Sequence, residues 1–351
     1  MAVYLDMTSR KQTNRIEYLD IFRSLGIILM IMGHVGFGEI FSHFIHAFHM
    51  PMFFWISGYL FRNNTNEDIV LKNVVIKKMK SLLLPYFIFG ILHYLIYMLI
   101  QYINQDAISV IPIIHLFSVN TKNLPICGAL WFLTALFFAD IIFLVIEKYI
   151  ENKIIKMLIV IAIACIGNIS KEIFSFTLPF ALSASFVGMG LYYIGYLFKK
   201  YENRRFIYFF MNMPWRKNIV LSIITIILIF INGYVNMRKE EYAIIPLFWI
   251  NAMLSIIVGI NYSKLIYLCI QNTIVNKYLM NIGKYSIIYV CLNEIVIMSV
   301  GKIVSRMNMS LYLSKILILL ISLFVLGEIG RFFLKLKNRG KIKAQSMERS
   351  I

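Results

Sequence analysis

The amino-acid sequence predicts an all-α, polytopic integral membrane protein of about ten transmembrane helices, with both termini in the cytoplasm. Of its 351 residues, 60% are hydrophobic and only 15% are charged, and the mean hydropathy is +0.76. So few charged residues could not cover the surface of a soluble protein of this size. Apolar stretches of about 20 residues, the length that spans a bilayer as a helix, recur along the whole chain.

Ten apolar windows are long enough to be transmembrane helices. With approximate edges they are 22–41, 43–62, 82–101, 126–147, 154–170, 177–198, 218–237, 243–260, 285–300 and 311–332. The apolar stretch 262–271 is flanked by Lys264 and Lys277, so we expect it to lie at the membrane interface. The first window has no small-residue cleavage site after it, so we expect a retained helix and not a signal peptide.

The distribution of Lys and Arg predicts the orientation. With a cytoplasmic N-terminus, the inner segments hold 27 Lys or Arg and the outer loops hold six, while Arg23 and Lys315 lie within helices. This asymmetry is a strong positive-inside signal for an even number of helices. The net charge of +18 therefore reflects topology and some attraction to anionic lipid, and does not indicate nucleic-acid binding. The six outer residues are Lys122, Lys171, Arg238, Lys239, Lys302 and Arg306.

We expect one membrane-embedded domain at 22–336, between a cytoplasmic N-terminal tail, 1–21, and a basic cytoplasmic C-terminal tail, 337–351, whose last dozen residues are loosely ordered. The chain contains no internal repeat and no Gly/Pro/Ser-rich linker that would divide it. Its four cysteines are scattered, mostly in apolar segments and without a Cys-x-x-Cys pair, so we expect buried, inert thiols. They are Cys127, Cys165, Cys269 and Cys291.

Arg23 and His34 are the strongest candidates for function. They are eleven positions apart in the first apolar window, almost three whole helical turns, so both side chains lie on one helix face. They are separated by roughly 16 Å along the helix axis. An ionisable residue inside a bilayer is costly and by default suggests a functional site. Asp20 precedes Arg23 by three residues, a spacing that permits an intrahelical ion pair. His34, near mid-membrane, could act as a general base, or could simply be hydrogen-bonded to a neighbouring helix.

A cluster of histidines opens the second window, with His43, His46 and His49 at spacings of three. The third drifts off the shared helix face and Glu39 is the only carboxylate nearby, so we predict no metal site. We expect His43 and His46 to be solvated at the outer interface. His49 lies deeper, just before Pro51, where a kink can free a backbone carbonyl and where a site residue is reasonable.

The basic run Lys77-Lys78-Met79-Lys80 lies on the predicted inner side. It is either a positive-inside anchor or a cationic cluster for a phosphate-bearing cytoplasmic ligand. We expect Glu328 and Arg331 to pair near the inner interface, and Asn251 and Thr134 to form interhelical hydrogen bonds. Glu294 needs either a partner or a proton. Other polar residues within the windows are Trp131, Asp140, Asn232 and Asn293.

Two of these motifs together resemble the acyltransferase-3 family of integral membrane acyltransferases. They are Asp20-x-x-Arg23 continuing as Arg-x10-His to His34, and the run FHMPMFFWISGY at 48–59. Weaker similarities extend the resemblance over roughly 16–330. They are the basic run with Leu84-Pro85-Tyr86, Trp131-Phe132-Leu133, Tyr193-Ile194-Gly195-Tyr196-Leu197, and Asn232-Gly233 with Ile282-Gly283-Lys284-Tyr285-Ser286, the last two being similar to fucose 4-O-acetylase-like members.

The resemblance implies a multi-pass protein of a bacterial plasma membrane that transfers an acyl group, usually acetyl from acetyl-CoA, to a hydroxyl. Carbohydrates and glycolipids, such as surface polysaccharides or their precursors, are typical acceptors. His34 would be the catalytic histidine, Arg23 its motif partner, and Arg23, Lys77 and Lys80 would bind the acyl donor. Weaker substrate-binding candidates are Glu39, His49, Trp131, Asn232 and Asn293. No tightly bound cofactor and no metal are implied.

Two departures from the family pattern affect this interpretation. Lys77 and Lys80 stand where relatives usually have Arg, which loses bidentate phosphate geometry. Asn293 stands where many relatives have His, and Asn cannot transfer protons. Two rival classes stay open at this point: a transporter or flippase for a polysaccharide or lipid-linked sugar, and a non-catalytic membrane scaffold. The missing internal repeat and the Arg-x10-His motif disfavour a transporter.

Overall fold

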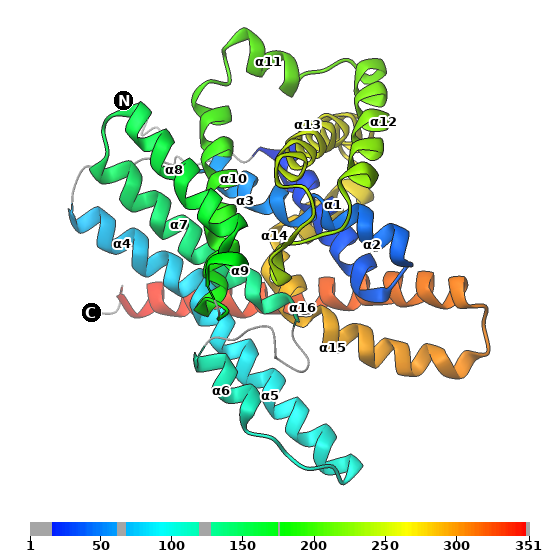
Figure 1. Cartoon of the computed structure of the whole chain (residues 1–351). Helices are drawn as coiled ribbons and strands as arrows, with labels where there is room; N and C mark the ends of the chain where they lie inside the picture. Colours follow the sequence, from blue (N-terminus) through cyan, green and yellow to red (C-terminus); the bar gives the residue numbers. More distant parts are fainter. Residues whose placement is uncertain (1–15, 62–67, 119–127, 175, 349–351) are drawn as a thin grey trace, which may run out of the picture.

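The computed structural model describes residues 16–61, 68–118, 128–174 and 176–348. Within these ranges the chain is almost entirely helical (Figure 1). The first half contains α1 (Glu17–Val35), α2 (Glu39–His46), α3 (His49–Tyr59), α4 (Asp68–Lys78), η1 (Met79–Leu83), α5 (Leu84–Asn104), α6 (Ile111–Ser118), η3 (Gly128–Leu130), α7 (Trp131–Tyr149), α8 (Lys153–Asn168) and α9 (Ser170–Ile173).

The second half contains η4 (Pro179–Ala181), α10 (Leu182–Lys200), α11 (Arg205–Met211), α12 (Trp215–Asn232), β1 (Val235–Asn236), η5 (Met237–Lys239), β2 (Glu241–Tyr242), α13 (Ile245–Ile270), α14 (Ile274–Lys284), α15 (Ser286–Val304), η6 (Ser305–Met307) and α16 (Leu311–Glu348). Strands β1 and β2 form one short antiparallel pair, in which Val235 faces Tyr242. The protein is therefore an all-α, multi-pass membrane protein, as the sequence predicts.

Eight helices of the described residues are long and apolar enough to cross a membrane, whereas the sequence predicts ten. The other two predicted segments are shorter helices. The fifth, 154–170, is the 16-residue α8, and the second, 43–62, is broken between α2 and α3. Pro51 explains the break, because its ring clashes with the carbonyl of Ala47, four residues earlier, where α2 has ended. The predicted kink at Pro51 is thus a complete interruption of the helix.

Four predicted boundaries also differ from the structure. The third span runs through α4, η1 and α5 as one stretch, 71–104, with a π-helical turn just before Pro85. The stretch 262–271 is not a separate interfacial segment, because α13 continues to Ile270. Lys264 is accommodated there by donating to the Met211 carbonyl at 2.6 Å and to Asn212 at 2.8 Å. The predicted loose C-terminal tail is helical to Glu348, and α1 begins at Glu17.

Helix α3 lies in the centre of the fold, packed against α1 on one side and α10 on the other (Figure 1). Two glycines permit the close approach of α3 and α10. A Cβ added at Gly58 would collide with the backbone of Tyr192, and one added at Gly195 would collide with the backbone of Trp55. Small residues at such crossings let helix backbones come together where lipid offers no hydrophobic driving force. The resulting rigid unit holds the FHMPMFFWISGY segment in place.

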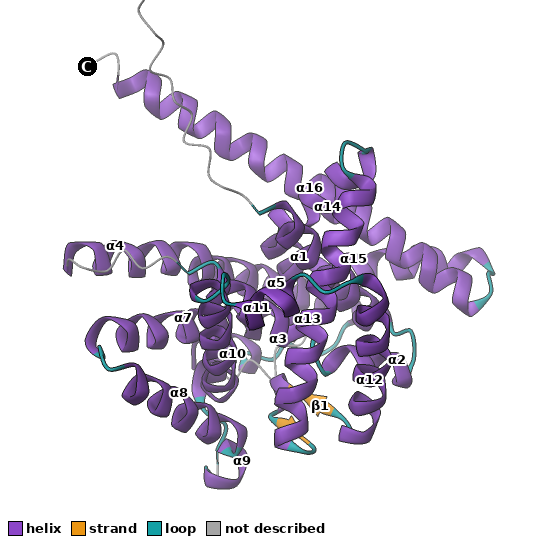
Figure 2. Ribbon diagram, turned by 90° about the horizontal axis from the view of Figure 1, so that it is seen from above, coloured by secondary structure: helices purple, strands orange, loops and turns teal. Residues whose placement is uncertain are grey.

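Helices that follow one another in the chain also pack together around this centre. Helices α12 and α13 pack together, as do α15 and α16, and Figure 2 shows the β1–β2 hairpin at the end of α12. Asn251 donates to the Leu228 carbonyl at 3.1 Å, so the predicted interhelical bond is confirmed. Thr134 instead donates within its own helix, to the Trp131 carbonyl at 2.9 Å, so that prediction is wrong. The predicted ion pair of Glu328 and Arg331 is present.

Candidate active site

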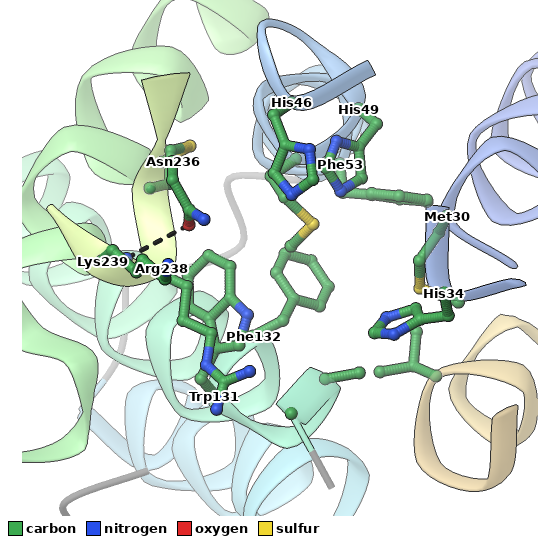
Figure 3. Close-up of a pocket in the computed structure, with 15 residues that line it drawn as sticks. Met30, His34, His46, His49, Phe53, Trp131, Phe132, Asn236, Arg238 and Lys239 are labelled. Carbon is green, nitrogen blue, oxygen red and sulfur yellow. Dashed lines mark hydrogen bonds between the residues drawn. The ribbon is translucent and has the colours of Figure 1, made fainter. Parts of the chain in front are cut away.

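A cavity of about 140 Å³ lies where α1, α2, α3, the start of α7 and the β1–β2 hairpin meet (Figure 3). Its wall combines apolar and aromatic side chains with a few polar groups, as is typical of ligand sites. The lining residues are Met30, His34, His46, His49, Met50, Phe53, Gly128, Ala129, Trp131, Phe132, Asn236, Met237, Arg238, Lys239 and Val290. Three of the sequence candidates therefore share one cavity: His34, His49 and Trp131.

His34 lies in the last turn of α1, and its side chain is 31% exposed where it faces the cavity. Its Nδ1 is 3.5 Å from Oε1 of Glu294, a residue of α15. The same carboxylate oxygen accepts the Gly128 N–H at 2.8 Å, which anchors it between α15 and the start of α7. When Nδ1–H points to a carboxylate, Nε2 carries the lone pair and is the basic atom. In this arrangement Glu294 orients the His34 imidazole, and His34 can act as a base through Nε2.

His46 and His49 form the wall opposite His34, with their ring centroids 5.1 Å apart (Figure 3). His46 Nδ1 lies 2.7 Å from the Ser42 carbonyl, and His49 Nδ1 lies 2.7 Å from the Ile45 carbonyl. A carbonyl can only accept, so each neutral ring has its hydrogen on Nδ1 and keeps Nε2 as an acceptor. His46 is therefore a cavity residue, and the expectation that it is solvated at the interface is wrong.

His43 points elsewhere. Its ring lies against Phe230 and Tyr234, and Nε2 is 3.3 Å from the Ile229 carbonyl of α12, so His43 is not simply solvated either. The three histidines at spacings of three thus divide between two surfaces. Among the residues that the structure describes, no three His, Cys, Asp or Glu side chains are grouped so that they could hold a metal ion.

A second cavity of about 150 Å³ contains Arg23, whose side chain is 25% exposed and lies 3.5 Å from Asp20 Oδ1. The predicted ion pair of these two residues is therefore confirmed. The lining of this second cavity also includes Ile27, Ser57, Leu82, Leu133, Leu136, Ser286 and Ile287. Phe53, Phe132 and Val290 belong to both cavities, and the two Phe rings are 5.6 Å apart. The cavities of Arg23 and His34 are therefore neighbours that share one thin wall.

Several sequence candidates lie outside both cavities. Glu39 is exposed on α2. Asn232 is 1% exposed at the end of α12, and Asn293 is equally buried, donating to the Tyr289 and Val290 carbonyls of its own helix. Both side-chain polar atoms of Asn232 and Oδ1 of Asn293 are buried without a hydrogen-bond partner among the described residues, and neither amide lines the two cavities.

The lysines of the basic run 77–80 differ in their contacts. Lys78 donates to Oδ2 of Asp140 at 2.6 Å, and Asp140 is 3% exposed, so this pair fastens the α4–η1 junction to α7. Lys77 and Lys80 are exposed and line neither cavity. They stand on the outer surface of the segment whose Leu82 forms part of the Arg23 cavity.

Three residues at the His34 cavity have roles that the sequence did not predict: Arg238 and Lys239 line it, and Glu294 lies behind its wall. Glu294 was identified only as a carboxylate in need of a partner, because nothing in the sequence says that α15 meets α1. Arg238 and Lys239 were read as loop charges. A signal for them existed: two adjacent cations in an outer loop oppose the positive-inside trend and so require another explanation.

Comparison with protein families supplies the deciding observation. A family model described as an acyltransferase domain, that of acyltransferase-3, matches residues 16–328 of this chain. The chain belongs to the acyltransferase-3 family. A search of curated proteins and of solved structures finds no match. The acyltransferase-3 match runs from α1 into the first half of α16, so it includes both cavities, and the protein is a multi-pass membrane acyltransferase.

Proposed function

We propose that this protein transfers an acyl group, acetyl from acetyl-CoA, to a hydroxyl of a carbohydrate or glycolipid, a surface polysaccharide or its precursor, at the plasma membrane of a bacterium. The observation that carries the proposal is the His34–Glu294 pair in a cavity that adjoins a second, Arg23-containing cavity. Family membership favours this acyltransferase over the transporter and the scaffold that the sequence left open.

The donor enters from the Arg23 side. In the orientation that the Lys/Arg asymmetry predicts, Arg23 lies toward the cytoplasm, where acyl-CoA is found, and Lys77 and Lys80 stand on the same side. Arg binds phosphate oxygens as a planar fork, whereas the exposed lysines attract them as point charges. Because about 16 Å of helix separates Arg23 from His34, Arg23 is better placed to hold the donor than to contact the reacting carbonyl.

The acyl end of the donor reaches His34 across the shared wall of Phe53, Phe132 and Val290. His34 Nε2 removes the proton from the acceptor hydroxyl while its oxygen attacks the thioester carbonyl carbon. Collapse of the tetrahedral intermediate breaks the carbon–sulfur bond, and the departing thiolate takes the proton back from His34. The products are the O-acyl ester and free CoA. Glu294 orients the imidazole and stabilises its protonated form during the step.

The test is acyl transfer by the purified protein in detergent or nanodiscs. With radiolabelled acetyl-CoA and a panel of glycans, labelled ester should form and CoA should be released. His34→Ala should reduce kcat by about 10²–10⁴-fold, the usual contribution of a general base, with membrane insertion unchanged. His43→Ala is the matched control, because His43 faces α12 and should retain activity. Transfer by His34→Ala at near the wild-type kcat would disprove the general-base role.

A further inference from the structure

The His34 cavity carries an excess of positive charge at the end away from Arg23. Arg238 and Lys239 both line it, and none of its lining residues in the described part of the chain is a carboxylate. Glu294 lies behind the wall, where a Cβ on Gly128 would touch both Glu294 Oε1 and Arg238 Nη1. Glu294 can balance Arg238. Glu240 and Glu241 follow Lys239 in the hairpin but do not line the cavity, and Glu240 Oε2 accepts from Ser170 Oγ at 3.1 Å, so Lys239 is a second cation among the lining residues.

The hairpin that presents these cations is well defined. Gly233, with φ of 81°, turns the chain out of α12, and Val235–Asn236 pairs with Glu241–Tyr242. Asn236 Oδ1 accepts the Lys239 N–H at 3.2 Å, which closes the η5 turn between the strands. Figure 3 shows this bond, with Arg238 beside Trp131 at the cavity. The turn is thus built to direct two adjacent basic residues to the reaction cavity.

The remaining polar groups of the wall suit a hydroxylated ligand. The Nε2 atoms of His46 and His49 are acceptors in the neutral rings and can receive hydrogen bonds from hydroxyls. Trp131 and Phe132 add aromatic surface on which an apolar sugar face can pack. The cavity therefore combines acceptors for hydroxyls with cations for a negative group.

The donor does not account for these cations. The phosphates of CoA belong at the cytoplasmic end, beside Arg23, while the hairpin joins α12 to α13 in an outer loop of the predicted topology. Basic residues are depleted in the outer loops of this chain, where they number six of 35, and two of the six are directed into one cavity.

We infer that the acceptor is anionic: the hydroxyl that is acylated belongs to a molecule bearing a carboxylate or a phosphate, and Arg238 and Lys239 bind that group. This inference rests on the proposed function and specifies its acceptor class. The anion positions the acceptor while His34 acts on its hydroxyl. A uronic-acid glycan and a sugar phosphate present the same chemistry to the cavity, and the experiment distinguishes them.

Binding of matched probes, without acyl-CoA, tests the inference independently of catalysis. Isothermal titration of the purified protein at low salt would compare methyl glucuronide with methyl glucoside, and glucose 6-phosphate with glucose. We expect the anionic member of at least one pair to bind about tenfold or more tightly than its neutral partner, as charge-assisted hydrogen bonds allow. The pair with the larger preference identifies the carboxylate or the phosphate source.

Lys239→Gln and Arg238→Gln should each remove most of this preference while leaving binding of the neutral probes within about twofold. Lys302→Gln, which removes an exposed cation elsewhere in the outer loops, is the matched control and should keep the preference. If Arg238→Gln does not fold, the probe preference of Lys239→Gln alone tests the inference. Equal binding of charged and neutral probes, or a preference that survives Lys239→Gln, would overturn the inference. Anion preference without acyl transfer to any acceptor would instead reject the proposed function and leave the anion site standing.

Discussion

Replacing Glu294 by Gln separates two contacts of this carboxylate, those with Gly128 and with His34. Oε1 accepts the Gly128 N–H at 2.8 Å and lies 3.5 Å from His34 Nδ1. A glutamine amide oxygen can still accept the Gly128 N–H, so the anchor between α7 and α15 should persist. Its neutral amide cannot stabilise protonated His34. We therefore expect Glu294→Gln to fold normally and to lose catalytic rate.

The magnitude follows from the geometry. Loss of a carboxylate that orients a catalytic histidine costs about 10–100-fold in supporting positions and up to about 10⁴-fold in a tight triad. The separation of 3.5 Å from His34 is longer than a strong hydrogen bond, so we expect kcat to fall about 10²-fold. The KM for acyl-CoA should change less than threefold, because the donor phosphates are proposed to bind at the other cavity.

Glu294→Ala is the contrasting variant. It leaves the Gly128 N–H without its side-chain acceptor, which costs about 1–3 kcal/mol, so both stability and kcat should fall. Steady-state release of CoA and thermal unfolding in the same detergent measure the two effects. Combining Glu294→Gln with His34→Ala should be no worse than His34→Ala alone, since the two residues act as a unit. A Glu294→Gln enzyme with more than half of the wild-type kcat would show that this carboxylate is structural only.

Three further predictions test topology, donor binding and packing. Single cysteines introduced at Lys302 and Lys77 should be labelled from outside and inside respectively by an impermeant maleimide, and the reverse pattern would refute the predicted orientation. Alanine at both Lys77 and Lys80 should raise the KM for acetyl-CoA about five- to tenfold in equal amounts of folded protein, since exposed charge contacts contribute up to about 1 kcal/mol each, and arginine at both should restore it. An unchanged KM would leave the run as a topology signal. Gly58→Val should prevent α3 from packing on the backbone of Tyr192 and cost more than about 3 kcal/mol, measured as loss of folded protein after detergent extraction, and full recovery of folded protein would contradict the packing argument.

The membrane class and the main catalytic candidate could be predicted because each depends on local sequence. A window of apolar residues is a transmembrane helix whatever its neighbours, since every backbone polar group must be satisfied within the segment. Residues 23 and 34 share a face because the helical repeat places them there, and each lines a cavity on α1. The same local rule failed at 43–62, where hydrophobicity is continuous but Pro51 interrupts the hydrogen bonding of the helix.

The partners of these residues were decided only by the tertiary structure. Glu294 reaches His34 from 260 positions away, and the hairpin from Gly233 to Tyr242 brings Arg238 and Lys239 to the same cavity after helices α2 to α12 have packed. Helix order in space depends on side-chain fit between helices, as at Gly58, and no period in the sequence encodes it. Composition and periodicity therefore predicted that α1 carries a candidate site inside a membrane, whereas packing determined which carboxylate, which cations and which second cavity lie beside it.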